Sequence, residues 1–307
     1  MQLPAMAAWA WIPIVIWAAF AQTIRNATQR TLVSSLGTLP ATLVRFLYGL
    51  PFAATWLALT SWLAGAAASL PPFGLAYAGW LGLGAAAQLA ATACLLVAMK
   101  QRNFIVGVTF SKTEVLQVGL FASVFLHELP TLYAGAAMVV ATIGVVLLSM
   151  PSRAGTDLAQ WRGNAAWFGL ASGAFFALSS VGYRGAALQL PGVSPWMTGA
   201  WGVLLAQLLQ TLLLGGWLAW RVPGTVAAVA KAWRLSLLAG MMGAMASIGW
   251  MTAVSMRPAV DVRTLGLIEV LFSYLVSRQL FRERSTRTEL LGLVLVAAGV
   301  LVVAAQL

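Results

Sequence analysis

The chain has 307 residues, of which 61% are hydrophobic and 8% are charged, and its mean hydropathy of +0.89 is far above that of an ordinary soluble domain. This composition excludes a soluble globular protein and predicts an integral membrane protein. The formal charge of +11 lies mostly in short segments between apolar runs, which favours cytoplasmic loops over nucleic-acid binding.

Ten apolar runs follow one another along the chain, each long enough to cross about 30 Å of hydrocarbon as a helix. They cover approximately residues 7–25, 40–61, 75–98, 103–126, 130–150, 164–185, 195–220, 235–255, 258–280 and 288–306. No Lys or Arg precedes Trp9, so we expect the first run to be a retained span and not a cleaved signal. The sequence therefore predicts an all-α integral membrane protein with ten transmembrane helices.

The two halves of the chain are similar when one is shifted by 155 residues, without any gap. Aligned pairs include Pro40 with Pro195, Glu114 with Glu269, Glu128 with Glu283 and Gly144 with Gly299. This pattern predicts two units, 1–152 and 153–307. Because each unit holds five spans, the second must cross the membrane in the opposite direction, so we expect two inverted five-helix repeats.

The basic residues indicate an orientation. In this topology thirteen of them fall on one face of the membrane: Arg25, Arg30, Lys100, Arg102, Arg153, Arg162, Arg221, Lys231, Arg234, Arg278, Arg282, Arg284 and Arg287. By the positive-inside rule that face is cytoplasmic, and both termini are then external. We expect a multi-pass protein of a bacterial-type inner membrane.

Each unit carries a Glu in its fourth span, a Glu at the following corner and a Gly in its fifth span. This arrangement resembles the EamA family of the drug/metabolite transporter superfamily over essentially the whole chain. Where the family has Glu-Pro, this chain has Glu114-Val115 and Glu269-Val270, so we expect less kinked helices. His127 stands where the family has the glycine of its Gly-Glu corner. The family usually keeps both termini in the cytoplasm, whereas the loop charges here predict the reverse.

Glu114 and Glu269 each lie 11 residues into their predicted spans, close to the bilayer midplane. An ionised acid there costs about 2.5–3.5 kcal/mol on insertion scales, so it should face the bundle interior or be neutralised. One interpretation places both acids at the repeat interface, where transporters bind substrate. The alternative is an internal ion pair with Lys112, Arg263 or Arg45. Lys112 is two residues from Glu114 and points to another side of the helix.

Several neighbours are candidates for the same site. Thr113 and Gln117 are expected to line the wall that Glu114 faces, and Ser273 lies one turn beyond Glu269. Arg45 and Tyr48 share a helix face suited to a carboxylate group, although Arg45 alternatively extends to the membrane interface. Trp17 and Trp250 lie deep in their spans and are expected to line a cavity, with core packing as the alternative.

The resemblance implies transport or export of small metabolites. From the residues we expect proton-coupled antiport of an amino acid or an amphipathic cation, in which protonation of Glu114 or Glu269 and substrate binding exclude each other. An uncoupled facilitator or a lipid-headgroup flippase is the alternative. No phosphate-binding G-x-x-x-x-G-K-[ST] motif occurs, and we expect neither an enzyme nor a cofactor. The expected partners are a small-molecule substrate, protons and membrane lipids, with the protein as a monomer.

Overall fold

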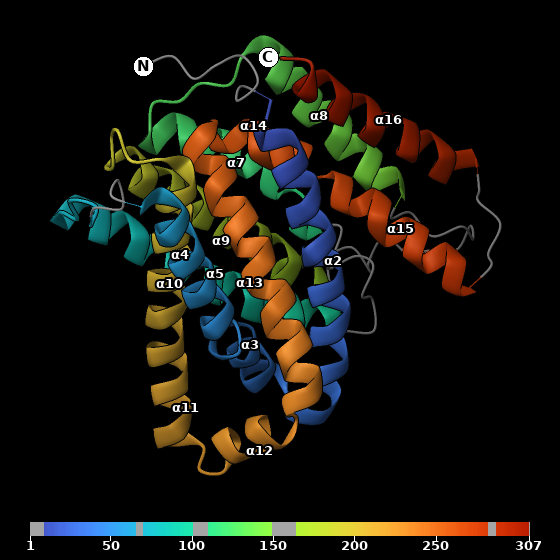
Figure 1. Ribbon diagram of the computed structural model, residues 1–307. Helices are drawn as coiled ribbons and strands as arrows, with labels where there is room; N and C mark the ends of the chain where they lie inside the picture. Colours follow the sequence, from blue (N-terminus) through green and yellow to red (C-terminus); the bar gives the residue numbers. More distant parts are fainter. Residues whose placement is uncertain (1–8, 66–69, 101–109, 149–163, 282–286, 307) are drawn as a thin grey trace.

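The computed structural model describes residues 9–65, 70–100, 110–148, 164–281 and 287–306, a part of the chain that is almost entirely helical and contains no strand (Figure 1). The helices of the first half are α2 (Trp11–Leu36), α3 (Thr38–Leu47), α4 (Leu50–Ala64), α5 (Leu75–Lys100), α7 (Glu114–Phe125) and α8 (Leu132–Leu148). Those of the second half are α9 (Asn164–Leu188), α10 (Pro195–Gln210), which continues through a π-helical segment (Thr211–Gly215) into α11 (Gly216–Arg221), then α12 (Thr225–Lys231), α13 (Trp233–Met256), α14 (Ala259–Leu265), α15 (Ile268–Phe281) and α16 (Arg287–Ala304).

Among the residues that the structure describes, six helices are long and apolar enough to cross a membrane. They span Thr38–Ala64, Leu75–Lys100, Ala166–Leu188, Pro195–Arg221, Trp233–Met256 and Arg287–Ala304. Two shorter apolar helices, α7 and α8, accompany them. The described part of the chain is thus all-helical, as the composition predicts, and the length and composition of its apolar helices are compatible with a multi-pass membrane protein.

The first predicted span, 7–25, is shorter at its C-terminal end than the observed helix. Helix α2 continues from Trp11 to Leu36, so Arg25 lies in mid-helix and is 1% exposed. The polar stretch after Ala21 resembles a loop in hydropathy, but its side chains Arg25, Thr28 and Gln29 are buried inside the bundle. Arg25 therefore does not belong among the loop charges that predicted the orientation.

The two predicted fourth spans are interrupted, contrary to the expectation of straighter helices. A turn at Lys112–Thr113 precedes α7, and a turn at Gly266–Leu267 separates α14 from α15. At both turns the backbone hydrogen bonds tighten to the i→i−3 pattern, as from Thr113 N to Phe110 O and from Glu269 N to Gly266 O, so no proline is needed to break the helix. Residues 103–109 of the first of these spans lie outside the described residues.

The corner after α7 uses a conformation that favours glycine. His127 has φ = 55°, the left-handed region in which a side chain is unfavourable. The Glu128 N–H there donates to Ala122 O, which closes the end of α7. His127 thus occupies a backbone conformation that usually favours glycine.

Helices from the two halves pack against each other in pairs: α2 with α13, α5 with α9, α4 with α10 and α8 with α16. Glycine permits the closest approaches. A Cβ on Gly182 would lie 2.7 Å from Gly84 N, and one on Gly249 would lie 2.7 Å from Ala18 Cβ. Small residues in the stretches 82–93 and 240–249 thus let helices pack closely at these positions.

One end of the bundle is held together by ion pairs. The Arg184 guanidinium donates to Glu128 at 2.7 and 2.9 Å and to Val254 O at 2.9 Å, which links α9, the corner after α7 and α13. Close to the start of α2 and the end of α16, Arg257 stacks 5.6 Å from the Trp11 ring and donates to Gln306 O at 2.7 Å. Helices α11 and α12 lie at the opposite end of the bundle (Figure 1).

Candidate functional site

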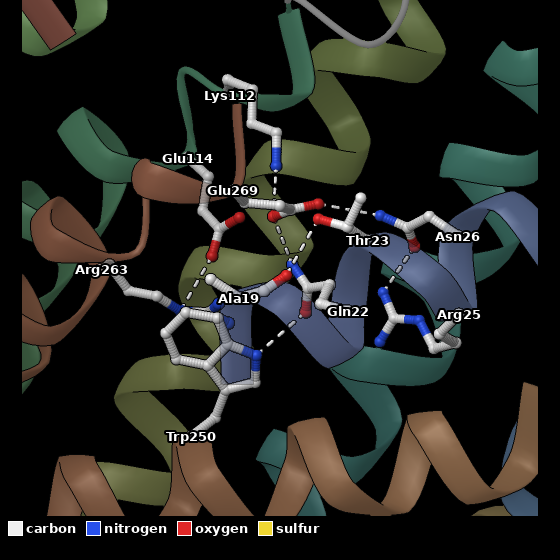
Figure 2. A network of polar contacts seen from close by, with 10 residues as sticks. All are labelled: Ala19, Gln22, Thr23, Arg25, Asn26, Lys112, Glu114, Trp250, Arg263 and Glu269. Carbon is white, nitrogen blue, oxygen red and sulfur yellow. Dashed lines mark hydrogen bonds and ion pairs between the residues drawn. The ribbon is translucent and has the colours of Figure 1, made fainter. Parts of the chain in front are cut away.

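Glu114 and Glu269 come together where the two fourth spans are broken. Each lies in the first turn of the helix that follows its break, α7 or α15, and Figure 2 shows the two carboxyl groups side by side between the helices. The positive end of a helix dipole favours a carboxylate at this position. The breaks thus bring two acids to helix N-termini inside the bundle.

Three donors hold the Glu269 carboxylate. Its Oε2 accepts from Lys112 Nζ and from Gln22 Nε2, both at 2.7 Å, and its Oε1 accepts from Asn26 Nδ2 at 2.9 Å. Gln22 is itself oriented by Trp250, whose Nε1 donates to Gln22 Oε1 at 3.0 Å. A buried carboxylate with this many donors is satisfied in its charged form.

Glu114 is held less completely. Arg263 Nε lies 3.0 Å from Glu114 Oε1, but its N–H donates to Ser180 Oγ at 2.7 Å, and Glu114 Oε1 accepts no hydrogen bond. The Arg263 guanidinium also stacks 4.8 Å from the Trp250 ring. The two acids therefore share a site but differ in how firmly their charged forms are bound.

The ion pairs cross between the two halves of the chain. Lys112 precedes α7 and pairs with Glu269 on α15, whereas Arg263 on α14 lies against Glu114 on α7. Internal ion pairs were the alternative left open by the sequence, and they are present for Lys112 and Arg263. Arg45 is a partner of neither acid among the described ion pairs.

A small cavity adjoins the two acids. Its lining includes Glu114, Glu269, Lys112, Arg263 and Trp250. Measured as the space open to the centre of a water-sized sphere, its volume is about 20 Å³, which is enough for one water molecule. No metabolite fits there, so this conformation is closed around the acids.

Other predicted residues lie away from this cavity. Gln117 Nε2 donates to Thr113 Oγ1 at 3.0 Å, and Thr113 in turn donates to Phe110 O, so these two side chains bond to each other and to the backbone that precedes α7. Tyr48 donates to Val229 O at 3.2 Å, so it is turned away from any carboxylate beside Arg45. Trp17 is 44% exposed, and the expectation that it lines a cavity is wrong because its face of α2 points outward. The side chain of Ser273 lies outside the described residues.

Arg45 is fully buried and does not extend to the membrane interface. It is 1% exposed, its Nη1 donates to Thr92 Oγ1 at 2.8 Å, and its Nε has no hydrogen-bond acceptor. Arg25 is a second guanidinium of this kind: Nη2 donates to Asn26 Oδ1 at 2.7 Å, while Nε and Nη1 have no acceptor. The stems of both arginines lie against Gly243 of α13.

Three residues of the site were missed in the sequence: Gln22, Asn26 and Ser180. Gln22 and Asn26 are four residues apart and therefore share one face of a helix, which was a usable signal once the run from 22 to 30 was recognised as helical. Ser180 lies in an apolar span with ordinary composition. Its neighbours in the sequence do not indicate that it would accept a hydrogen bond from Arg263.

Comparisons with known proteins show the fold. No protein-family model and no curated protein matches the chain. Among solved structures, one described as "Crystal structure of protein" is similar over 97% of this chain and 96% of its own chain, with a TM-score of 0.67 and 16% sequence identity. The chain thus shares its fold with a protein of similar length.

Proposed function

We propose that this protein is a secondary transporter of the EamA type, built from two inverted five-helix repeats with ten spans, which exports a small metabolite in exchange for protons. The observation that carries the proposal is the pair of crossed ion pairs, Lys112 with Glu269 and Arg263 with Glu114, at two helix breaks beside a closed cavity. Acidic residues in membrane spans mark ion and proton pathways, and broken helices are typical of transporter binding sites.

The helix contacts support the inverted repeat. When the spans are numbered within each half, α2 is the first span of the first half and contacts α13, the third span of the second half. In the same way, α9 is the first span of the second half and contacts α5, the third span of the first half. Glycine contacts follow the same rule: Gly144 lies against Gly292, and their counterparts Gly299 and Ala137 also lie against each other. A two-fold relation between the halves accounts for both observations.

Proton exchange requires each acid to leave its partner. Protonation of Glu269 would weaken three donor contacts, one of which is the ion pair with Lys112, whereas Glu114 has a cationic neighbour and no donor to Oε1. We therefore expect Glu114 to exchange its proton first. A substrate that takes up Arg263 or Lys112 then competes with the carboxylate, so substrate and proton alternate.

Alternating access also requires the cavity to open. The breaks before Glu114 and Glu269 let the halves of each span move separately, because the turns interrupt the helix hydrogen bonds. The apolar helix pairs on either side, such as α8 with α16, are packed through glycines and move as units. The closed cavity corresponds to one stage of this cycle.

Liposome transport tests the proposal. A pH difference imposed across the membrane should drive accumulation of a substrate, found by screening amino acids and cationic drugs, against its own gradient. Glu114→Gln and Glu269→Gln should abolish this coupling because a glutamine cannot exchange a proton. Glu289→Gln on α16 is the matched control, since it removes an acid outside the cavity. If both site variants keep full pH-driven accumulation, the coupling mechanism is wrong.

The same assay distinguishes proton-coupled antiport from the two alternative functions. An uncoupled facilitator equilibrates substrate whatever the pH difference. A lipid-headgroup flippase moves labelled lipid between leaflets in the same vesicles, and either result in the wild-type protein replaces the antiport proposal.

A further inference from the structure

Two buried arginines form no ion pair with a carboxylate in the part of the chain that the structure describes. Arg25 and Arg45 are each 1% exposed. Every other buried ionisable cluster in the described part of the chain contains an acid: Glu114 and Glu269 face Arg263 and Lys112, and Glu128 and Asp261 face Arg184 and Arg257. The acids that could neutralise the two arginines are thus engaged elsewhere.

The charge of the bundle interior is consequently unbalanced. Around the two helix breaks and the neighbouring parts of α2 and α3, the described residues hold four cations, Arg25, Arg45, Lys112 and Arg263, and two anions, Glu114 and Glu269. This leaves a surplus of two positive charges. An uncompensated buried charge is strongly unfavourable, and a buried guanidinium remains protonated. A protein that retains two of them requires an anion at some stage of its cycle.

The two arginines are also close enough to act together. A Cβ on Gly243 would lie 3.1 Å from Arg45 Cγ and 3.4 Å from Arg25 Cδ, so both stems meet at one point on α13. Each guanidinium has nitrogens without an acceptor, Nε of Arg45 and Nε and Nη1 of Arg25. Their present partners, Thr92 and Asn26, are neutral. Unpaired donors on two guanidinium groups whose stems meet at Gly243 suit an oxyanion, which accepts several charge-assisted hydrogen bonds at once.

Asn26 connects this pair to the acids. It accepts from Arg25 Nη2 at 2.7 Å and donates to Glu269 at 2.9 Å, so a single side chain separates Arg25 from the carboxylate network (Figure 2). An anion bound at Arg25 would compete for the guanidinium that orients Asn26. Binding there is therefore coupled to Glu269 through one hydrogen-bonded residue.

We infer that Arg25 and Arg45 form the oxyanion-binding half of the substrate site, so that the transported metabolite carries a carboxylate or phosphate group that lies between the two guanidinium groups. This rests on the proposed transport function and narrows its substrate class: a purely cationic compound is not a substrate. The bundle must open between α2, α3 and α13 to admit the group, since both arginines are enclosed in the closed conformation.

Thermal unfolding of the full chain in detergent tests the site without any need for transport. The probes are sodium succinate, sodium phosphate and choline chloride, each compared at the same ionic strength. Succinate or phosphate should raise the apparent melting temperature by several degrees, because a ligand that binds only the folded state stabilises it. Choline should have no effect. The oxyanion that stabilises the protein identifies the group, carboxylate or phosphate.

Three variants complete the test. Arg25→Gln and Arg45→Gln should each weaken binding of that probe by about 10- to 100-fold, whereas Arg221→Gln, which removes an exposed arginine at the end of α11, should leave it unchanged. Without probe, the two site variants should melt at the same temperature as wild type or higher, since glutamine removes an uncompensated charge. Lower melting of both variants would assign the arginines a structural role and overturn the inference.

The outcomes separate this inference from the transport proposal. If no oxyanion stabilises the wild type, or if chloride at the same concentration does so equally, the oxyanion site is wrong even where liposomes show pH-driven transport. If an oxyanion binds through both arginines but is not accumulated in liposomes, the site stands and the antiport proposal fails.

Discussion

At the residue scale, the Lys112–Glu269 ion pair makes a prediction about stability. Both side chains are largely buried, 17% and 5% exposed, so removing one partner leaves the other charged inside the bundle. Lys112→Met and Glu269→Gln should each lower the free energy of unfolding by about 3 kcal/mol. The double variant should lose much less than the sum, because neither charge is left alone. Denaturant unfolding in detergent measures this cycle, and additive losses would show that the two groups do not interact.

The sequence identified the participants of this pair but not their pairing. Lys112, Arg263, Glu114 and Glu269 are recognisable as ionisable residues in apolar runs. The cross-pairing depends on how α7 and α15 meet, which no local pattern contains. Gln22 was missed for a different reason: the residues after Ala21 lower the hydropathy of the first run, and inward-facing polar side chains give the same signal as a loop.

At the element scale, α8 and α16 are packed through backbone contacts. A Cβ on Gly144 would lie 2.7 Å from Gly292 O and 2.8 Å from Val296 N, and backbone atoms cannot move aside as a flexible side chain does. Gly144→Ala should therefore lower the free energy of unfolding by about 1–3 kcal/mol.

Gly135 on the same helix is the matched control for Gly144. A Cβ there meets nothing within 4 Å, so Gly135→Ala should stabilise the protein by up to about 1 kcal/mol through helix propensity. Thermal unfolding of the two variants side by side should give shifts of opposite sign. Equal effects would show that the close contact of α8 with α16 contributes nothing.

Most helices followed from the sequence because apolar run length alone sets a membrane span. The interruptions within helices were not all predictable in this way. Prolines are the usual signal of a kink, and the second span is indeed divided at Tyr48–Gly49, just before Pro51. The breaks before Glu114 and Glu269 have no proline. At the break before Glu269, a tertiary contact requires glycine: a Cβ on Gly266 would lie 2.7 Å from Trp250 Cη2. The sequence does not show that Trp250 packs there.

At the scale of the whole molecule, the described interior holds more positive than negative charge, and this surplus supports the proposed anion site. The 155-residue repeat predicts that the two halves are related, and the pairing of α2 with α13 and of α5 with α9 follows from such a relation. The unbalanced charge does not follow from it, because Arg45 has Ala200 as its repeat mate and Arg25 has Ser180. Asymmetry of this kind is expected where substrate binds, since a substrate is itself asymmetric.

The last prediction concerns which end of the molecule is closed. Arg184 joins Glu128 and Val254 O at the end near the start of α2 and the end of α16, and this contact must separate if the cavity is to open on that side. Losing hydrogen bonds to a charged group costs about 1.5–3 kcal/mol, so Glu128→Gln should raise the population open to that side by about tenfold or more.

Leu267, which lines the cavity and is 3% exposed, provides the probe for that opening. In a Cys94→Ala background, Leu267→Cys should react slowly with a membrane-impermeant maleimide added on the side where α2 begins and α16 ends. Glu128→Gln should accelerate labelling about tenfold, because the population open to that side rises by about this factor. Arg234→Gln, which removes an exposed charge at the start of α13 at the other end of the bundle, should not. Unchanged labelling in Glu128→Gln would mean that the Arg184 contact is not what closes this side, and the closure would then lie in the packed glycine contacts between the halves.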